Sequence, residues 1–450
     1  MIYHFLKVLM QISLRFFFRN VQVKGLENIP QTGPLLIVSN HPNTVLDPIV
    51  IGCYVDRKIF FLAAAKYFKS GFAKWLLPKF NMIPVFRAQD NPDELKNNDE
   101  VFSKCYDHLK KDGVILIFPE GISLTNRQLK KIKTGAARIA LGAEAANAFT
   151  LNVRIVSIGL NYSDPHNFRS DVFINIDEPI EVMNYKARYS ENDIAAVNKM
   201  TDEIRSRLEK HIIAIEDAAI DELVKKIEII YKSQLLKDLG YTPKIKEHDF
   251  IVTKAINEEV HYYYRYQPQR VEQFKREIDE YFRILDRLKL SDRVLKKFPG
   301  QGSILMDTMK SVFYMLIGLP VFIYGFINNY IPYRLPGIIT NRLNIARDFY
   351  GALYMLIGTL SFLIFYGLQI TLMHYFFQNI LITICYAVTL PVTGLFAYYY
   401  ARRYKNMRGR WLIFSLFYRK TSLITAIINM RQHIIDELER GRKEYTEMGL

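Results

Sequence analysis

Residues 35–48 read Leu-Leu-Ile-Val-Ser-Asn-His-Pro-Asn-Thr-Val-Leu-Asp-Pro, an apolar run followed closely by His41 and Asp47. The run at 35–39 does not alternate polar and apolar residues, which is typical of a strand buried on both faces of a sheet. Six positions correspond to about 600° around a helix, so the two side chains cannot meet on a regular helix. We therefore expect His41 in the loop that leaves the strand, with Asp47 folded back toward it.

Similar β-type runs alternate with helical stretches over residues 21–180. They lie at 59–63, 83–86, 114–118, 155–160 and 172–176. Strands that alternate with helices indicate an α/β fold, and apolar runs indicate a sheet covered on each side. We predict a mixed, largely parallel sheet covered by helices.

The composition narrows the class of partner. Half of the 450 residues are apolar, which excludes a disordered or collagen-like chain. The net charge of +15 favours nucleic acid, anionic lipid or a phosphorylated substrate. Neither an RNP-type run nor a zinc-finger spacing is present, so nucleic acid is a poor candidate. The three cysteines are far apart and fit a reducing, cytoplasm-facing compartment.

The sequence offers little support for metal or covalent catalysis. It has no His-Glu-x-x-His run and no cluster of its nine histidines, so we predict no metal site. It also has no Gly-x-Ser-x-Gly motif, which disfavours a serine acyl-enzyme.

Residues 1–20 predict a basic amphipathic helix. Its polar positions recur at steps of three and four: His4, Lys7, Gln11, Arg15 and Arg19. Because charged residues interrupt the apolar run, a cleaved signal peptide is not expected. We interpret the helix as a membrane-interface anchor, with a helix that faces the protein core as the alternative.

The remainder divides into a charged helical segment at 190–300 and a membrane domain at 301–450 with a basic C-terminal tail. The apolar stretches at 350–373 and 380–400 reach the ~20 residues needed to cross a bilayer. Basic residues flank this pair on both outer sides, so we predict a transmembrane hairpin with cytoplasmic flanks. The stretch at 311–331 contains Pro320 and the pair Asn328 and Asn329, and we predict a re-entrant or interfacial element there.

Two further runs carry candidate site residues. The strand at 114–118 leads into Pro119-Glu120-Gly121, which places a carboxylate at the sheet edge where open α/β folds bind ligands. Residues 83–87 deliver Arg87, whose planar guanidinium suits phosphate. Each signal also has a structural alternative. His41 could be a hydrogen-bonded loop residue, Asp47 a helix cap, Pro-Glu-Gly a turn, and Arg87 an ion-pair partner.

Taken together and in this order, the three blocks at 41–47, 83–87 and 118–121 resemble the phospholipid/glycerol acyltransferase family, also called PlsC-like. A fourth block at 156–162 is similar, with Ser157 where the family commonly has proline. The five residues between His41 and Asp47 and the long membrane part look like the glycerol-3-phosphate acyltransferase branch. Many members use 1-acylglycerol 3-phosphate, so the acceptor stays open.

The resemblance implies a glycerol-3-phosphate acyltransferase-like catalytic domain at 21–189, acting on the cytoplasmic face of a membrane in phospholipid synthesis. His41 would take the proton of the acceptor hydroxyl, and Asp47 would orient its ring. Phe118, Pro119, Glu120 and Gly121 would form the substrate-binding block, and Arg87 and Lys133 would hold phosphate.

The same resemblance implies the partners. The donor would be acyl-CoA or acyl-carrier protein, the acceptor a glycerol phosphate or lysophospholipid, and no cofactor would be needed. The alternatives are acylation of another lysolipid and a non-catalytic, membrane-tethered lipid-binding protein.

Overall fold

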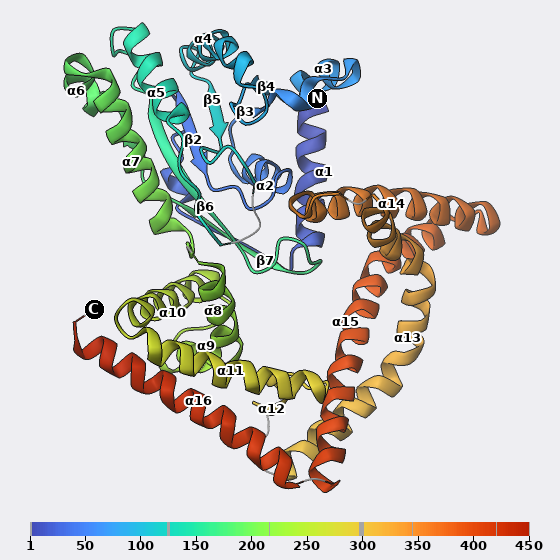
Figure 1. Cartoon of the computed structure of the whole chain (residues 1–450). Helices are drawn as coiled ribbons and strands as arrows, with labels where there is room; N and C mark the ends of the chain where they lie inside the picture. Colours follow the sequence, from blue (N-terminus) through green and yellow to red (C-terminus); the bar gives the residue numbers. More distant parts are fainter. Residues whose placement is uncertain are drawn as a thin grey trace. The chain divides into compact units, whose positions relative to one another are not determined.

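The computed structural model describes residues 2–123, 127–215, 217–296, 301–343, 345–419 and 421–449 (Figure 1). The chain forms two compact units. The first comprises Met1–Ala218, Lys244–Phe250 and Asn344–Leu356, and the second comprises Ala219–Pro243, Ile251–Leu343 and Ile357–Leu450.

The first unit is built on an eight-stranded sheet with the order β1-β7-β6-β2-β5-β3-β4, and β8 pairs with β6. The strands are β1 (Asn20–Lys24), β2 (Leu35–Ser39), β3 (Ile59–Ala64), β4 (Met82–Val85), β5 (Val114–Ile117), β6 (Arg154–Tyr162), β7 (Asp171–Ile176) and β8 (Ile180–Glu181). The pairings of β6 with β7 and β8 are antiparallel, and the other pairings are parallel. The predicted mixed, largely parallel sheet is confirmed. The sequence reading missed β1, an alternating edge strand, and the two-residue β8.

Helices cover both faces of this sheet. Successive residues of a strand point to opposite faces. Leu35 and Ile37 accordingly pack in one core with α1 (Ile2–Phe17) and α2 (Leu46–Tyr54). Leu36 and Val38 pack in a second core with α4 (Asn98–Leu109), α5 (Gly135–Ala146) and α7 (Asp193–His211). Strand β2 is therefore buried on both faces, as its unbroken apolar run predicts.

Helix α1 packs against the sheet domain along one face. Leu14 and Phe17 are buried in the first core. Lys7 Nζ and Gln11 Nε2 donate hydrogen bonds to the carbonyls of Val55 and Cys53, at the C-terminal end of α2. Part of the predicted polar stripe therefore caps a neighbouring helix and does not face lipid head groups. Among the α1 side chains that the structure describes, at 6–17, three large apolar ones are exposed: Val8, Ile12 and Phe16. Their contact with a membrane stays a prediction.

The first unit extends past the predicted boundary at 189. Helix α7 follows α6 (Lys186–Glu191), and its Met200, Ile204 and Leu208 are buried in the second core. Periodicity identified α7 as a helix but could not show which surface it covers. The compact unit consequently runs to Ala218.

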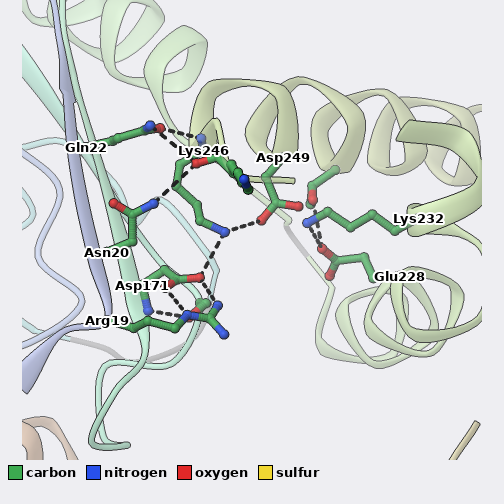
Figure 2. Close-up of polar contacts among 11 residues, drawn as sticks. Arg19, Asn20, Gln22, Asp171, Glu228, Lys232, Lys246 and Asp249 are labelled. Atoms are coloured by element: carbon green, nitrogen blue, oxygen red, sulfur yellow. Dashed lines mark hydrogen bonds and ion pairs between the residues drawn. The ribbon is translucent and has the colours of Figure 1, made fainter. Parts of the chain in front are cut away.

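Polar contacts tie residues 244–250 to the edge of the same sheet, as Figure 2 shows. Lys246 Nζ lies 2.9 Å from Asp171 Oδ2 and 3.6 Å from Asp249 Oδ2. Arg19 Nε donates to Asp171 Oδ1 at 2.9 Å from the other side. The start of α10 (Lys246–Tyr266) therefore belongs to the first unit, although the helix continues into the second.

The second unit is helical. Its elements are α8 (Ala218–Ile230), α9 (Lys232–Asp238), most of α10, α11 (Pro268–Arg287), α12 (Asp292–Leu295), α13 (Gln301–Arg342), most of α14 (Arg347–Phe377), α15 (Ile380–Arg419) and α16 (Thr421–Glu447). A cavity of about 280 Å³ among α8, α10, α11 and α16 is lined by Glu259, Phe274 and Leu438, among others.

The predicted basic tail includes α16, a helix that is ion-paired within this unit. Arg431 Nε lies 2.7 Å from Asp292 Oδ1, and Glu444 Oε2 lies 2.6 Å from Arg270 Nη1. The part of the predicted tail that forms α16 is therefore held by ion pairs to other helices of the second unit.

Among the residues that the structure describes, three helices are long and apolar enough to cross a membrane: Met309–Arg342, Arg347–Phe377 and Ile380–Lys405. Helix α13 is continuous through 311–331 and past Pro320, and the predicted re-entrant or interfacial character of that stretch stays a prediction. If all three helices cross, the basic flanks of the second and third helices still lie on one side of the membrane, and the start of the first helix lies on the other. The predicted hairpin topology therefore stays a prediction.

The asparagine pair that argued against a crossing is hydrogen-bonded to neighbouring helices. Tyr366 Oη donates to Asn329 Oδ1 at 2.6 Å, and Asn329 Nδ2 donates to the Leu390 carbonyl at 3.2 Å. Tyr386 Oη donates to Asn328 Oδ1 at 2.8 Å. Polar groups paired between helices can be accommodated in a membrane-spanning bundle.

Candidate active site

The predicted site residues come together at one edge of the sheet. Strands β2, β5, β3 and β4 are neighbours and parallel, so their carboxyl ends share an edge. His41 follows β2, Phe118 follows β5 and Arg87 follows β4. This is the edge at which open α/β sheets bind ligands.

A histidine and a carboxylate form a direct pair there. His41 Nδ1 lies 2.9 Å from Asp47 Oδ2. The same oxygen accepts a hydrogen bond from the Asn43 amide at 2.7 Å, and Oδ1 accepts one from Tyr162 Oη at 2.9 Å. Asp47 lies in the first turn of α2, whose N-cap residue is Val45. The side chain of Asp47 is therefore committed to the histidine and is not a helix cap.

Burial sets the electrostatics of this pair. It raises the pKa of Asp47, while the hydrogen bonds from His41, Asn43 and Tyr162 oppose the increase. Burial beside Asp47 also raises the pKa of Tyr162 far above its usual range. Tyr162 consequently keeps its proton at neutral pH and acts as a donor to the carboxylate.

The His41 ring is fixed on a second side by stacking. Its centroid lies 3.8 Å from that of Phe118, with the ring planes 10° apart. The side chain is 12% exposed, and Nε2 has no hydrogen-bond partner among the residues that the structure describes. With Nδ1 directed at Asp47, Nε2 is the nitrogen left to act on a ligand.

Glu120 joins three parts of the site. Its Oε1 accepts a hydrogen bond from the His41 amide and its Oε2 accepts one from the Lys130 amide, both at 2.9 Å. The side chain is buried, and burial raises its pKa. These contacts give Glu120 a positioning role, and its contact with a glycerol moiety stays a prediction.

Two cationic side chains border Gly121. Arg87 Nη1 donates to the Gly121 carbonyl at 2.6 Å, and its Nε donates to Asp90 Oδ2 at 2.6 Å. A Cβ atom on Gly121 would lie 2.6 Å from Lys133 Nζ, and the φ angle of +69° also favours glycine. Burial, with the charge of Arg87, lowers the pKa of Lys133. Two cations held this close favour an anion between them.

Pro119 supports this arrangement through its backbone. Its side chain is buried, and its carbonyl accepts a hydrogen bond from the Lys133 amide at 2.9 Å. As with Glu120, the structure gives Pro119 a supporting role, and substrate contact stays a prediction.

Sequence reasoning assigned no role to Tyr162, Asn40 or Asp348. Asn40 pairs through both side-chain atoms with the backbone of Leu160, at 3.0 and 2.8 Å, and so fixes the loop to β6. Thr44 donates its amide to the Asp348 carbonyl at 3.1 Å and its hydroxyl to the Asp348 side chain. The position of Tyr162 in the fourth block was the available signal, but its contact with residue 47 depends on β6 lying beside β2.

Comparisons with known proteins find a family match over the part of the chain that carries this site. Residues 20–161 match the family model described as Acyltransferase. The domain formed by residues 20–161 belongs to the acyltransferase family. The matched range contains His41, Asp47, Arg87, Glu120 and Lys133 and ends one residue before Tyr162.

The acyltransferase domain and its flanks are similar to lipid enzymes. Glycerol-3-phosphate O-acyltransferase 1 of Saccharomyces cerevisiae is 24% identical over 62% of this chain and 47% of its own length. A chloroplast 1-acyl-sn-glycerol-3-phosphate acyltransferase of Arabidopsis thaliana is 26% identical over 31% of this chain and 37% of its own. The chain thus spans about half or less of these curated relatives.

A solved structure is also similar, at a low level. The 1-acyl-sn-glycerophosphate acyltransferase PlsC of Thermotoga maritima is 18% identical and covers 46% of this chain and 78% of its own, with a TM-score of 0.33.

Proposed function

We propose that the acyltransferase domain transfers a fatty acyl group from an acyl thioester to a hydroxyl of glycerol 3-phosphate or 1-acylglycerol 3-phosphate, in phospholipid synthesis. The observation that carries the proposal is the 2.9 Å contact between His41 Nδ1 and Asp47 Oδ2. The contact leaves Nε2 as a base at the ligand-binding edge of the sheet. The similarity to glycerol-3-phosphate and 1-acylglycerol-3-phosphate acyltransferases supports these acceptors.

In the proposed reaction, His41 Nε2 takes the hydroxyl proton as the acceptor oxygen attacks the thioester carbonyl. The C–S bond then breaks, and the leaving thiolate takes the proton from the imidazolium. Asp47 stabilises the imidazolium between these steps, because its carboxylate lies 2.9 Å from Nδ1. The reaction needs no cofactor besides the acyl thioester, whose carrier would be CoA or acyl-carrier protein.

Arg87 and Lys133 would hold the acceptor phosphate. Both lie beside Gly121, and Gly121 follows Glu120, whose carboxylate is hydrogen-bonded to the His41 backbone. A phosphate between these cations would bring a glycerol hydroxyl within the range of His41. The position of the bound hydroxyl is part of the proposal.

The membrane part of the chain suits a lipid product. In the described part of the chain, three helices have the length and composition of membrane spans. An acylated product prefers the bilayer, so a domain held at its surface can release product sideways. We place the domain on the cytoplasmic side, where acyl thioesters and anionic lipids are found.

The test is acyl transfer by the full chain in nanodiscs. Labelled acyl-CoA or acyl-carrier protein is supplied with glycerol 3-phosphate, 1-acylglycerol 3-phosphate or another lysolipid, and the product is identified by mass. We expect transfer to a glycerol phosphate and its loss in His41→Gln. A matched control is His211→Gln, because His211 Nε2 also lies 3.0 Å from an aspartate, Asp177.

Two results would count against the proposal. A His41→Gln variant with the wild-type rate would remove His41 as the base. Absence of thioester consumption with every acceptor would favour the non-catalytic lipid-binding protein.

A further inference from the structure

A short helical lobe separates β3 from β4. It consists of η2 (Ala65–Phe68), α3 (Gly71–Leu76) and η3 (Leu77–Phe80). Four of its aromatic side chains are exposed: Tyr67 by 41%, Phe72 by 69%, Trp75 by 58% and Phe80 by 38%. Large apolar side chains exposed together mark interaction surfaces of soluble and membrane proteins. The lobe therefore does more than connect two strands.

The charge of this lobe has one sign. Its four lysines are exposed: Lys66, Lys69, Lys74 and Lys79. No aspartate or glutamate occurs between Asp56 and Asp90. Lys79 Nζ lies 3.4 Å from the centroid of the Trp75 ring, and the rings of Phe72 and Trp75 lie 6.1 Å apart. Aromatic rings interleaved with lysines are typical of surfaces that enter the head-group region of a membrane.

The lobe is also close to the candidate active site. It starts where β3 ends, at the sheet edge that carries His41 and Arg87. Lys66 Nζ lies 3.4 Å from Asp90 Oδ1, and Asp90 Oδ2 is bonded to Arg87. One ion-pair chain therefore joins the lobe to the cationic side of the site.

We infer that residues 65–80 form a docking surface for anionic lipid, which seats the phosphate-binding side of the acyltransferase domain against the membrane. This contact is additional to the three apolar helices. Anionic head groups complement the four lysines, and the acyl boundary accommodates Phe72 and Trp75. An acidic carrier protein would also meet the lysines, and the experiment distinguishes that partner.

The tryptophan content of the chain provides a probe. The sequence contains two tryptophans, Trp75 and Trp411. Trp411→Phe in the full chain leaves Trp75 as the reporter. This variant is reconstituted in nanodiscs of neutral phosphatidylcholine, with or without phosphatidylglycerol, and brominated lipid serves as quencher. We expect a blue-shifted emission that brominated lipid quenches in anionic discs, with quenching reduced by high salt.

A charge-reversal variant tests the lysines. Lys69→Glu/Lys74→Glu/Lys79→Glu is expected to lose the dependence on anionic lipid, since each lysine near such a surface changes binding about fivefold. Lys104→Glu/Lys110→Glu/Lys111→Glu, at three exposed lysines of the first unit outside the lobe, is the matched control and should keep it. Circular dichroism verifies that the triple variant folds. If it does not fold, the quenching of Trp75 in the Trp411→Phe variant, which keeps all the lysines, still tests the inference.

Two results would overturn the inference. One is Trp75 emission that brominated lipid does not quench in either disc. The other is emission that shifts only when an acidic acyl-carrier protein is added in detergent. Because quenching is recorded without turnover, failure of the docking surface and failure of the proposed acyl transfer are separate results.

Discussion

Removing the hydroxyl of Tyr162 tests how the carboxylate of the pair is held. Tyr162 Oη donates to Asp47 Oδ1 at 2.9 Å, and Asp47 has no exposed side-chain surface. Tyr162→Phe keeps the ring and removes this donor. A hydrogen bond to a charged group is worth about 1.5–3 kcal/mol. At about 1.36 kcal/mol per factor of ten, we expect acyl transfer to fall roughly tenfold to a hundredfold.

The pH profile separates this effect from general damage. The Tyr162 hydrogen bond lowers the pKa of Asp47, against the burial that raises it. Without that bond, Asp47 holds its proton to higher pH, so the acid limb of kcat/KM should move to higher pH. The measurement is the initial rate of acyl transfer from pH 5 to 9, with thermal unfolding recorded in parallel.

Tyr185→Phe is the matched control. The Tyr185 hydroxyl is bonded to Glu203 in the same unit, and neither residue contacts the described site. We expect its rate and acid limb to match the wild type. A Tyr162→Phe variant with an unmoved acid limb and a wild-type rate would refute the reasoning.

Three further changes give distinct readouts. Gly121→Ala forces a positive φ on alanine and places a Cβ 2.6 Å from Lys133 Nζ. We expect the KM for the phosphate acceptor to rise, and the protein to lose about 1–2 kcal/mol of stability. An unchanged KM would contradict a phosphate site there. Asp348→Ala removes the carboxylate that accepts the hydrogen bond of the Thr44 hydroxyl, in the loop between His41 and Asp47. We expect kcat to fall roughly tenfold or more, with little change in KM. An effect on KM alone would argue against a role of Asp348 in positioning this loop. Burial raises the pKa of Glu259 to about 7, so the wild type loses stability as the pH rises from about 4.5 to 7. At pH 8, Glu259→Gln should therefore raise the free energy of unfolding by up to about 3 kcal/mol and the unfolding temperature with it. At pH 4, the variant and the wild type should unfold at the same temperature. Equal differences in unfolding temperature at both pH values would show that this carboxyl does not titrate in the cavity.

The position of each main site residue could be predicted because each one lies close in sequence to the strand that it follows. An apolar run that ends in a polar loop places that loop at a strand end, and parallel strands bring their ends to one edge. Those two rules suffice to place His41, Glu120 and Arg87 together. The geometric argument that His41 and Asp47 could not meet on one helix is also confirmed, since His41 precedes α2 and Asp47 lies in its first turn.

Partners distant in sequence could not be predicted in this way. Tyr162 reaches Asp47 because β6 pairs with β2, and Asp348 reaches Thr44 across 304 positions. Neither contact leaves a trace in the spacing of the residues near it. The same holds for Glu120, whose two carboxylate oxygens are bonded to backbone amides that its own motif does not include.

The amino-acid order by itself indicated the alternation of strands and helices over 21–180, the helical character of the rest of the chain, most of the strands and the candidate site residues. It did so because side-chain periodicity and turn chemistry act over a few residues. Only the tertiary structure decided what each apolar face covers: α7 packs on the sheet domain, one face of α1 does the same, and Asn328 and Asn329 find partners on α14 and α15. An apolar stripe has the same sequence pattern whether lipid, a sheet or another helix buries it, so the burying surface is a property of the fold.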